Sequence, residues 1–173
     1  IVLITTAGDL TVTDGGDGDA TGIDADGAGN VRLDSNMASV DLQSTVQSGT
    51  GNITVIAATD VVTAADVDVV SGGDGTIDLE ASGGSVTLST TSDQDAGSGD
   101  VRVLAATNVT LGGTLTTTGD ASITADAGWI RDGDDDDSVD VEADGLRLDA
   151  AVGIGELGAD DNAIETSEST ISG

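Results

Sequence analysis

Closely spaced aspartates beside glycines are the residues of this 173-residue chain that could do chemistry. They gather in three acidic loops: Asp14, Asp17 and Asp19 with Asp24 and Asp26 just after them; Asp93 and Asp95; and Asp132, Asp134 and Asp136 within the run 132–137. Calcium takes about six to eight oxygen ligands, and alternate aspartates on a tight glycine turn can supply several of them. The first and third loops are therefore candidate Ca²⁺ sites. The alternative is that all three are solvated acidic loops, as in secreted proteins of high-salt environments.

Known calcium-binding motifs match the sequence only in part. The segment 72–79 is similar to the calcium-binding nonapeptide G-G-x-G-x-D-x-U-x, but Ile77 stands where that motif has its ligand aspartate. No loop completes the EF-hand pattern, which needs a central glycine and a distal glutamate. Ca²⁺ is thus the one cofactor that the sequence suggests, and it is suggested by the density of aspartates rather than by a motif.

Carboxylates on neighbouring strands could also cut a glycosidic bond if they lie about 5 to 9 Å apart. Asp78 and Asp100 are the pair to consider for that reaction. Sites of this kind also need aromatic side chains for stacking sugars and cations for acidic glycans, whereas the chain has a single tryptophan, Trp129, and only 4 basic residues. We therefore expect no enzymatic activity, and we expect Trp129 to fill the core or make a surface contact.

Charge and composition exclude several classes of function. The formal net charge is −29, which disfavours nucleic acid as a partner because phosphate binding needs a basic face. The chain has no histidine or cysteine, which removes the commonest general base and thiolate chemistry. No apolar run is long enough to span a membrane. At 37% hydrophobic residues, placed mostly in alternation, the chain is nevertheless expected to fold.

Short alternating strands separated by glycine-rich turns would position the aspartates. The pieces 75–79 and 85–88 recur one period later as 99–103 and 108–111. A corner dipeptide recurs at Gly8-Asp9, Gly29-Asn30, Gly51-Asn52, Gly75-Thr76, Gly99-Asp100, Gly119-Asp120 and Asp137-Ser138. Each is followed by an inward-facing pair: Leu10/Val12, Val31/Leu33, Ile53/Val55, Ile77/Leu79, Val101/Val103, Ala121/Ile123 and Val139/Val141. This period predicts an all-β fold, a right-handed parallel β-helix, with glycines that supply the backbone conformation of the corners.

Two further sides complete each predicted coil. The second strand is expected at Val40/Leu42, Val61, Val86/Leu88, Val109/Leu111, Ile130 and Leu146/Leu148, and the third at Val67/Val69, Leu115 and Val152/Ile154. If the pattern continues past the last residue onto a second copy of the chain, the gap between corners has the length of two more coils. The sequence therefore predicts about eight rungs of roughly 22 residues each. It also predicts that the range 1–173 is one segment of a longer shaft.

The arginines are expected to face outward between apolar neighbours. Arg102 lies between Val101 and Val103 and should stand one rung from Asp78, so an ion pair between them is predicted. Exposed pairs are worth less than about 1 kcal/mol, so this pair would favour the register of the coils rather than form a binding site.

The run from Ala105 to Ala125 resembles the repeats of filamentous-haemagglutinin-type adhesins and other giant bacterial surface proteins. The segments 153–155 and 162–166 resemble a further G-I-G…N-x-L-x-T element of such proteins, which there carries a proline that this chain lacks. The resemblance implies a secreted, extracellular or cell-surface protein that acts in adhesion or as a fibre shaft. Its expected partners are similar units stacked end to end, and cell-surface or extracellular-matrix ligands. The alternative function is a calcium-dependent binding module of a secreted protein.

Overall fold

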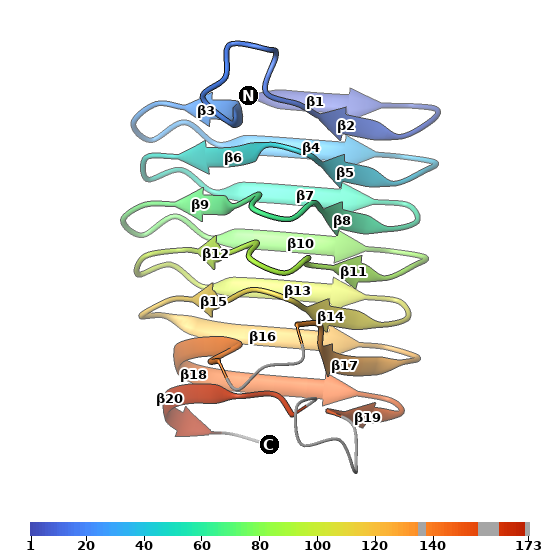
Figure 1. Cartoon of the computed structure of the whole chain (residues 1–173), viewed down its shortest axis with the longest axis vertical. Coiled ribbons are helices and arrows are strands. Elements are labelled where there is room, and N and C mark those ends of the chain that lie inside the picture. Colours follow the sequence, from blue (N-terminus) through green and yellow to red (C-terminus); the bar gives the residue numbers. More distant parts are fainter. Residues whose placement is uncertain (135–137, 156–162, 172–173) are drawn as a thin grey trace.

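The chain folds as a parallel β-solenoid of about six turns, which confirms the predicted fold class. The structure is a computed structural model that describes residues 1–134, 138–155 and 163–171, and every regular element in that part of the chain is a β-strand. Figure 1 shows the coils piled along the long axis, with β1 at one end and β20 at the other.

Each coil has three sides, and strands of the same side pair with one another in parallel. The first side consists of β1 (Val2–Thr5), β4 (Val31–Ser35), β7 (Ile53–Ala57), β10 (Ile77–Ala81), β13 (Val101–Ala105), β16 (Asp120–Ala125) and the second half of β18 (Val141–Ala150). The second side consists of β2 (Leu10–Val12), β5 (Val40–Leu42), β8 (Val61–Thr63), β11 (Val86–Thr87), β14 (Val109–Leu111), β17 (Trp129–Asp132) and β19 (Gly153–Ile154). The third side consists of β3 (Thr21–Ala25), β6 (Thr45–Ser48), β9 (Val69–Ser71), β12 (Gln94–Asp95), β15 (Leu115–Thr116), the first half of β18, and β20 (Thr166–Ile171).

The core is a set of aliphatic columns that run along the axis. Ile53, Ile77 and Val101 occupy one register position in successive coils, as predicted, and all three are buried. Val55, Leu79 and Val103 form the adjoining column in the same strands. The alternation read from the sequence thus gives the inward face of each strand, because side chains two positions apart lie on the same face.

The number of turns is smaller than predicted. Seven strands of the second side are separated by six circuits of the chain, instead of the roughly eight expected. On the first side Val2 is level with Arg32, and the position of Val31 recurs in later coils at Ile53, Ile77, Val101, Ala121 and Leu146. Most of these turns contain more residues than the predicted period, so fewer turns fit into the length of the chain.

Two of the seven predicted corners are wrong. Leu10 pairs with Val40, so Gly8-Asp9 precedes a second-side strand rather than a first-side strand. Val141 pairs with Leu115 on the third side, and Val139 is exposed, so Val139/Val141 is not a first-side pair. Residue 137 itself lies outside the described residues. The five corners between these two, at positions 29, 51, 75, 99 and 119, precede first-side strands as predicted.

The same displacement affects two other predicted pairs. Leu146 is level with Ala121, which places Leu146/Leu148 on the first side, not the second. Ile154 is level with Ile130, which places Val152/Ile154 on the second side, not the third. The cause is a long loop after β17, which inserts extra chain into one corner and shifts everything that follows.

At Gly51, Gly75 and Gly99 glycine is required by close packing rather than by a positive φ, whereas Gly8 has a φ of 80°, as the sequence suggested. Gly51, Gly75 and Gly99 are absent from the residues with positive φ. A Cβ on Gly75 would instead lie 2.5 Å from the carbonyl oxygen of Gly51 in the preceding coil. Gly51 and Gly99 would approach the carbonyls of Gly29 and Gly75 even more closely. Stacked corners at strand spacing leave no room for a side chain pointing at the neighbouring coil.

Polar side chains at the corners connect one coil to the next. The amide N–H of Asn52 donates to Oδ1 of Asn30 at 2.9 Å, and the N–H of Thr76 donates to Oδ1 of Asn52 at 3.0 Å. At the start of the third side, the N–H of Asp93 donates to Oδ1 of Asp68 at 3.0 Å. Such side chains have a structural role as acceptors for the backbone of the adjacent coil.

Candidate metal centre

A carboxylate occupies a core position at the end of β17. Asp132 is level with Leu111, and its column continues in other coils as Leu42 and Leu88, both buried. Only 5% of Asp132 is exposed. A charged group in such a position is unfavourable by several kcal/mol unless it is paired or binds a cation, in order-of-magnitude terms. Asp132 is therefore the residue whose presence in the core needs a functional explanation.

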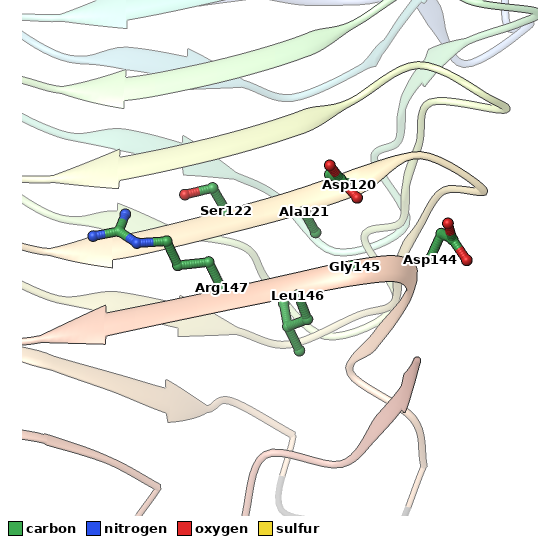
Figure 2. Close-up of a pocket in the computed structure, with 7 residues that line it drawn as sticks. All are labelled: Asp120, Ala121, Ser122, Asp144, Gly145, Leu146 and Arg147. Atoms are coloured by element: carbon green, nitrogen blue, oxygen red, sulfur yellow. The ribbon is translucent and has the colours of Figure 1, made fainter. Parts of the chain in front are cut away.

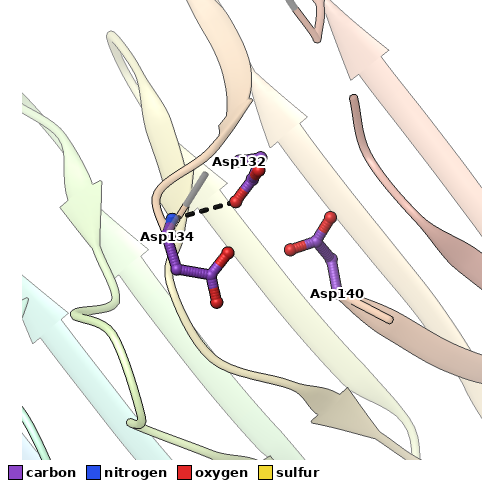
Figure 3. A group of neighbouring side chains, drawn as sticks. All are labelled: Asp132, Asp134 and Asp140. Atoms are coloured by element: carbon purple, nitrogen blue, oxygen red, sulfur yellow. Dashed lines mark hydrogen bonds between the residues drawn. The ribbon is translucent and has the colours of Figure 1, made fainter. Parts of the chain in front are cut away.

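Two more aspartates are brought to Asp132 by the chain that follows. Asp134 is half-buried, and Asp140, which directly precedes β18, is 3% exposed. One carboxylate oxygen from each of Asp132, Asp134 and Asp140 lies within 4.8 Å of those of the other two. Figure 3 shows the side chains of Asp134 and Asp140 extending into the space beside Asp132, with the N–H of Asp134 bonded to Asp132. We call these three residues the aspartate cluster.

The local path of the chain explains how this cluster forms. In the preceding coil, only Gly112 and Gly113 separate Leu111 from Thr114 at the corner between the second and third sides. In the cluster's coil the positions of Leu111 and Thr114 are taken by Asp132 and Asp140, and a much longer connection joins them. We call the corner between Asp132 and Asp140, which holds this longer connection, the widened corner. The widened corner has room for three carboxylates where the preceding coil has a tight glycine turn.

The hydrogen bonds of the cluster leave one buried oxygen unused. Oδ1 of Asp132 accepts the N–H of Asp134 at 3.0 Å, and Oδ2 of Asp140 accepts the N–H of Glu165 at 2.9 Å. Oδ2 of Asp132 is buried and has no hydrogen-bond partner among the described residues. Glu165, one coil further along, also has a buried oxygen, Oε2, without a partner in the same part of the chain. Unsatisfied buried oxygens are rare in folded proteins. Oε1 of Gln94 is another among the described residues, but Asp132 differs from it in belonging to a cluster of carboxylates, which favours a bound cation there.

The electrostatics of the cluster disfavour charge on Asp140. Burial raises the pKa of the Asp140 carboxyl to about 7, and the nearby Asp132 and Glu165 side chains also raise it, although the hydrogen bond from the Glu165 N–H opposes them. A group with this pKa is only partly ionised near neutral pH in the absence of a cation.

No arginine forms an ion pair with Asp132 or Asp140 in the described part of the chain. Arg32 pairs with Asp34 at 2.7 Å, and Arg147 pairs with Asp149 at 2.6 Å. Arg102 contacts Asp78 at 2.8 Å, which confirms the predicted ion pair, and also contacts Glu80 at 2.7 Å. Arg131 lies over the ring of Trp129, 5.0 Å from its centroid. Because these four arginines are the only basic residues of the chain, no basic side chain neutralises the two buried carboxylates.

The other predicted metal ligands are not brought together in this way. Asp14, Asp17 and Asp19 lie on the loop between β2 and β3, where Asp14 accepts the N–H of Gly16 and Asp19 accepts the N–H of Thr21 at 2.8 Å. Asp24 accepts Nε2 of Gln47 at 2.9 Å and, with Asp26, lines a shallow groove. Asp136 lies outside the described residues.

Two of the three members of the cluster could be predicted from the sequence, and the third could not. Asp132 and Asp134 were candidates because of the acidic run, whereas Asp140 and its neighbour Glu165 were not. The sequence did contain a signal for the core position of Asp132, because Ile130-Arg131-Asp132 corresponds in the repeat to Val109-Thr110-Leu111. No comparable signal exists for Asp140, since its place depends on the path of the inserted loop.

The lateral face of the first side carries a second, shallower feature. A groove of about 510 Å³ is lined by Asp120, Asp144, Gly145, Arg147 and neighbouring residues, and Figure 2 shows it between β16 and β18. In this groove Gly145 is level with Asp120, and the small side chain of Ser122 is level with Arg147. Asp78, the candidate for glycoside hydrolysis, lines another such groove and is bound by Arg102. Asp100, the other candidate for that reaction, lines the same groove as Asp78.

The comparisons with known proteins give no relative. No family model matches the chain, and neither the curated proteins nor the solved structures contain a match. Within the described residues there is no helix of the length and apolarity needed to cross a membrane.

Proposed function

We propose that the chain is a structural segment of the shaft of an extracellular bacterial surface fibre or giant adhesin. One observation carries the proposal: parallel ladders run through all three sides, from β1 to β20, with a register shift between β3 and β6. A solenoid of this kind adds length by adding coils, because each coil contacts only its neighbours and no new core is needed. The protein's task is then mechanical, and no catalytic role is proposed.

The first coil supports stacking with a neighbouring unit. Ile1, Val2, Leu3 and Ile4 are between 43% and 63% exposed, and among the described strands β1 pairs only with β4. Leu3 is level with the buried Leu33, so its side chain ends a core column. An open apolar strand edge is a site for adding another strand. A similar unit stacked end to end, in the same polypeptide or as a separate subunit, would cover it.

The lateral surface fits a shaft that stays apart from its neighbours. Negative charge is spread over the chain, with a formal total of −29, and like charges repel adjacent shafts at low ionic strength. Cell-surface or extracellular-matrix ligands would be contacted from these flanks, and the resemblance to adhesin repeats supports a secreted location.

A fusion of two copies in tandem tests the shaft function. Six turns at about 4.8 Å each give a rise of about 29 Å per unit, so a fusion that forms one continuous solenoid should be about twice as long in small-angle scattering or electron microscopy. Placing Leu3→Lys at the junction should break the rod into two bodies. Met37→Lys, at an exposed side chain of the loop between β4 and β5, is the matched control. Two independently tumbling bodies in the unmodified fusion would exclude the proposal.

The aspartate cluster favours a second candidate function, a calcium-dependent binding module. In that case an acidic loop would contact a partner in the presence of Ca²⁺. Binding of the chain to immobilised matrix proteins, measured with Ca²⁺ and with chelator, separates the two functions. A binding module should lose Ca²⁺-dependent attachment in the variant Asp132→Asn, whereas a shaft segment should show no such attachment to lose.

A further inference from the structure

We infer that Asp132, Asp134 and Asp140 form a Ca²⁺ site that closes the widened corner between β17 and β18. The inference goes beyond the shaft function and does not depend on it, since the site lies within one chain. Its basis is the combination of three converging carboxylates with a buried oxygen of Asp132 that no group in the described residues satisfies.

The unpartnered oxygen is the decisive feature, because exposed acidic clusters are common without a metal. Asp132 belongs to a buried column that is aliphatic except at Thr63, and it is only 5% exposed. Of its two oxygens, only Oδ1 accepts a hydrogen bond in the described residues. A water molecule could donate to Oδ2, but it could not offset the charges of two neighbouring carboxylates. A divalent cation would coordinate Oδ2 and also offset those charges.

The donor set selects a hard cation. All three side chains offer carboxylate oxygens, and the chain has no histidine or cysteine that would favour zinc or another transition metal. Calcium–oxygen distances are about 2.3–2.6 Å, so two ligands of one Ca²⁺ can be up to about 5 Å apart. The observed spread of at most 4.8 Å fits that sphere. Magnesium requires a tighter, near-octahedral arrangement and keeps most of its waters, which suits a buried corner less well.

The contact with the following coil explains what the cation would do. Asp140 is joined to that coil because its Oδ2 accepts the N–H of Glu165, whose own Oε2 is buried without a partner among the described residues. A cation held by Asp132 and Asp140 would therefore fix both ends of the widened corner and brace the coil that contains Glu165. The site would act as a clamp on the C-terminal coils.

Calcium titration of the full chain tests the inference. After treatment with chelator, isothermal calorimetry at constant ionic strength should show one saturable Ca²⁺ per chain, and Ca²⁺ should raise the melting temperature. Mg²⁺ at the same concentration should raise it much less. Absence of a saturable site, or an equal response to Mg²⁺, would overturn the assignment.

Two variants in which asparagine replaces one aspartate serve as the test and its control. Asp132→Asn keeps the side-chain size and should abolish the calcium-induced rise in melting temperature, and in chelator it should melt above the unmodified chain because the buried charge is gone. Asp126→Asn removes the same charge at an exposed position between β16 and β17 and should leave calcium binding unchanged. If Asp132→Asn does not fold, Asp140→Asn is expected to lose the calcium response in its place. Retention of that response by both cluster variants, or its loss in Asp126→Asn, would refute the site.

Discussion

Replacing Gly75 by alanine tests whether the corners are determined by space or by backbone conformation. Gly75 does not have positive φ, so alanine could adopt its backbone conformation. Where nothing else intervenes, such a change stabilises a protein by about 0.4–1 kcal/mol through the unfolded chain. In this solenoid, however, the new Cβ would lie 2.5 Å from the carbonyl oxygen of Gly51 and closer still to Oγ of Ser71. The two explanations therefore predict opposite signs for the change in the free energy of unfolding caused by Gly75→Ala.

The size of the destabilisation depends on the groups that the new methyl group would displace. Forcing a methyl group into a packed site costs about 1–3 kcal/mol, and backbone on the neighbouring coil cannot yield easily. Oγ of Ser71, which is fully buried, donates to the carbonyl of Gly51 at 2.7 Å, and the methyl group would displace it. Losing a buried hydrogen bond of this kind costs a further amount of about 1–3 kcal/mol. After subtraction of the gain from the unfolded chain, we expect Gly75→Ala to destabilise the fold by about 3 kcal/mol.

Gly29→Ala is the matched control in the same column of corners. Its Cβ would meet nothing closer than 3.3 Å, so a small shift of its neighbours would suffice and Gly29→Ala should cost much less than Gly75→Ala. Both variants can be measured by chemical denaturation, with melting temperature as a second readout; a loss of about 3 kcal/mol corresponds to about 6–12 °C in a chain of this size. If Gly75→Ala were as stable as the unmodified chain, or if the two variants behaved alike, the close-packing explanation would be refuted.

Two further predictions concern charge. The pKa of Asp140, which lies beside Asp132, Asp134 and Glu165, is raised from 3.8 to about 7 in the folded chain, so the folded state binds this proton more strongly than the unfolded state. In chelator, the stability of the chain should therefore fall as pH rises from about 4 to about 7. Melting temperatures at pH 5 and pH 7.5 should show this decrease, and Asp140→Asn should lessen it. A higher melting temperature at pH 7.5 would contradict the sign. Arg102→Gln should cost less than about 1 kcal/mol, because the arginine side chain is 44% exposed, and the difference should vanish in about 1 M salt; a larger loss that persists in salt would show a packing role instead.

The strands of the fold could be predicted because one physical rule governs them. A narrow core filled by aliphatic side chains requires strict alternation, and that alternation can be read in Ile77-Asp78-Leu79 and its counterparts. The five corners from Gly29 to Gly119 were located for the same reason. The reason that glycine is required at such corners could not be predicted in the same way. It depends on the distance to the preceding coil, and the sequence of a single corner does not contain that distance.

The errors in counting turns have a different cause. Loops at the corners face solvent and can be lengthened without disturbing the stacked strands, so their length is not fixed by the period. The first coil, from Val2 to the level of Arg32, is longer than those that follow, and the corner after Asp132 takes an insertion. Once the insertion is crossed, a strict period assigns Leu146 and Ile154 to the wrong sides.

The aspartate cluster depends on the same insertion. In an unwidened corner, such as the one between Leu111 and Thr114, glycines place successive coils in direct backbone contact, and a Cβ on Gly113 would lie 2.7 Å from the backbone nitrogen of Ser92. Three carboxylates could not be accommodated in that space. The acidic run was visible in the sequence, but its conversion into a buried cluster required Asp132 to enter the core and Asp140 to return beside it.

Any effect of a cation at this corner must be local, because a solenoid is held together by contacts between adjacent coils. The cluster touches the coil of Leu111 through the register of β14 and β17, and the coil of Glu165 through Asp140. The N-terminal coils, with their column of Leu33, Val55 and Leu79, are separated from it by intervening coils. Calcium would therefore stiffen the C-terminal part of the segment and leave the rest as it is, so that one shaft could combine a stretch of constant stability with a stretch whose stability depends on the surrounding medium.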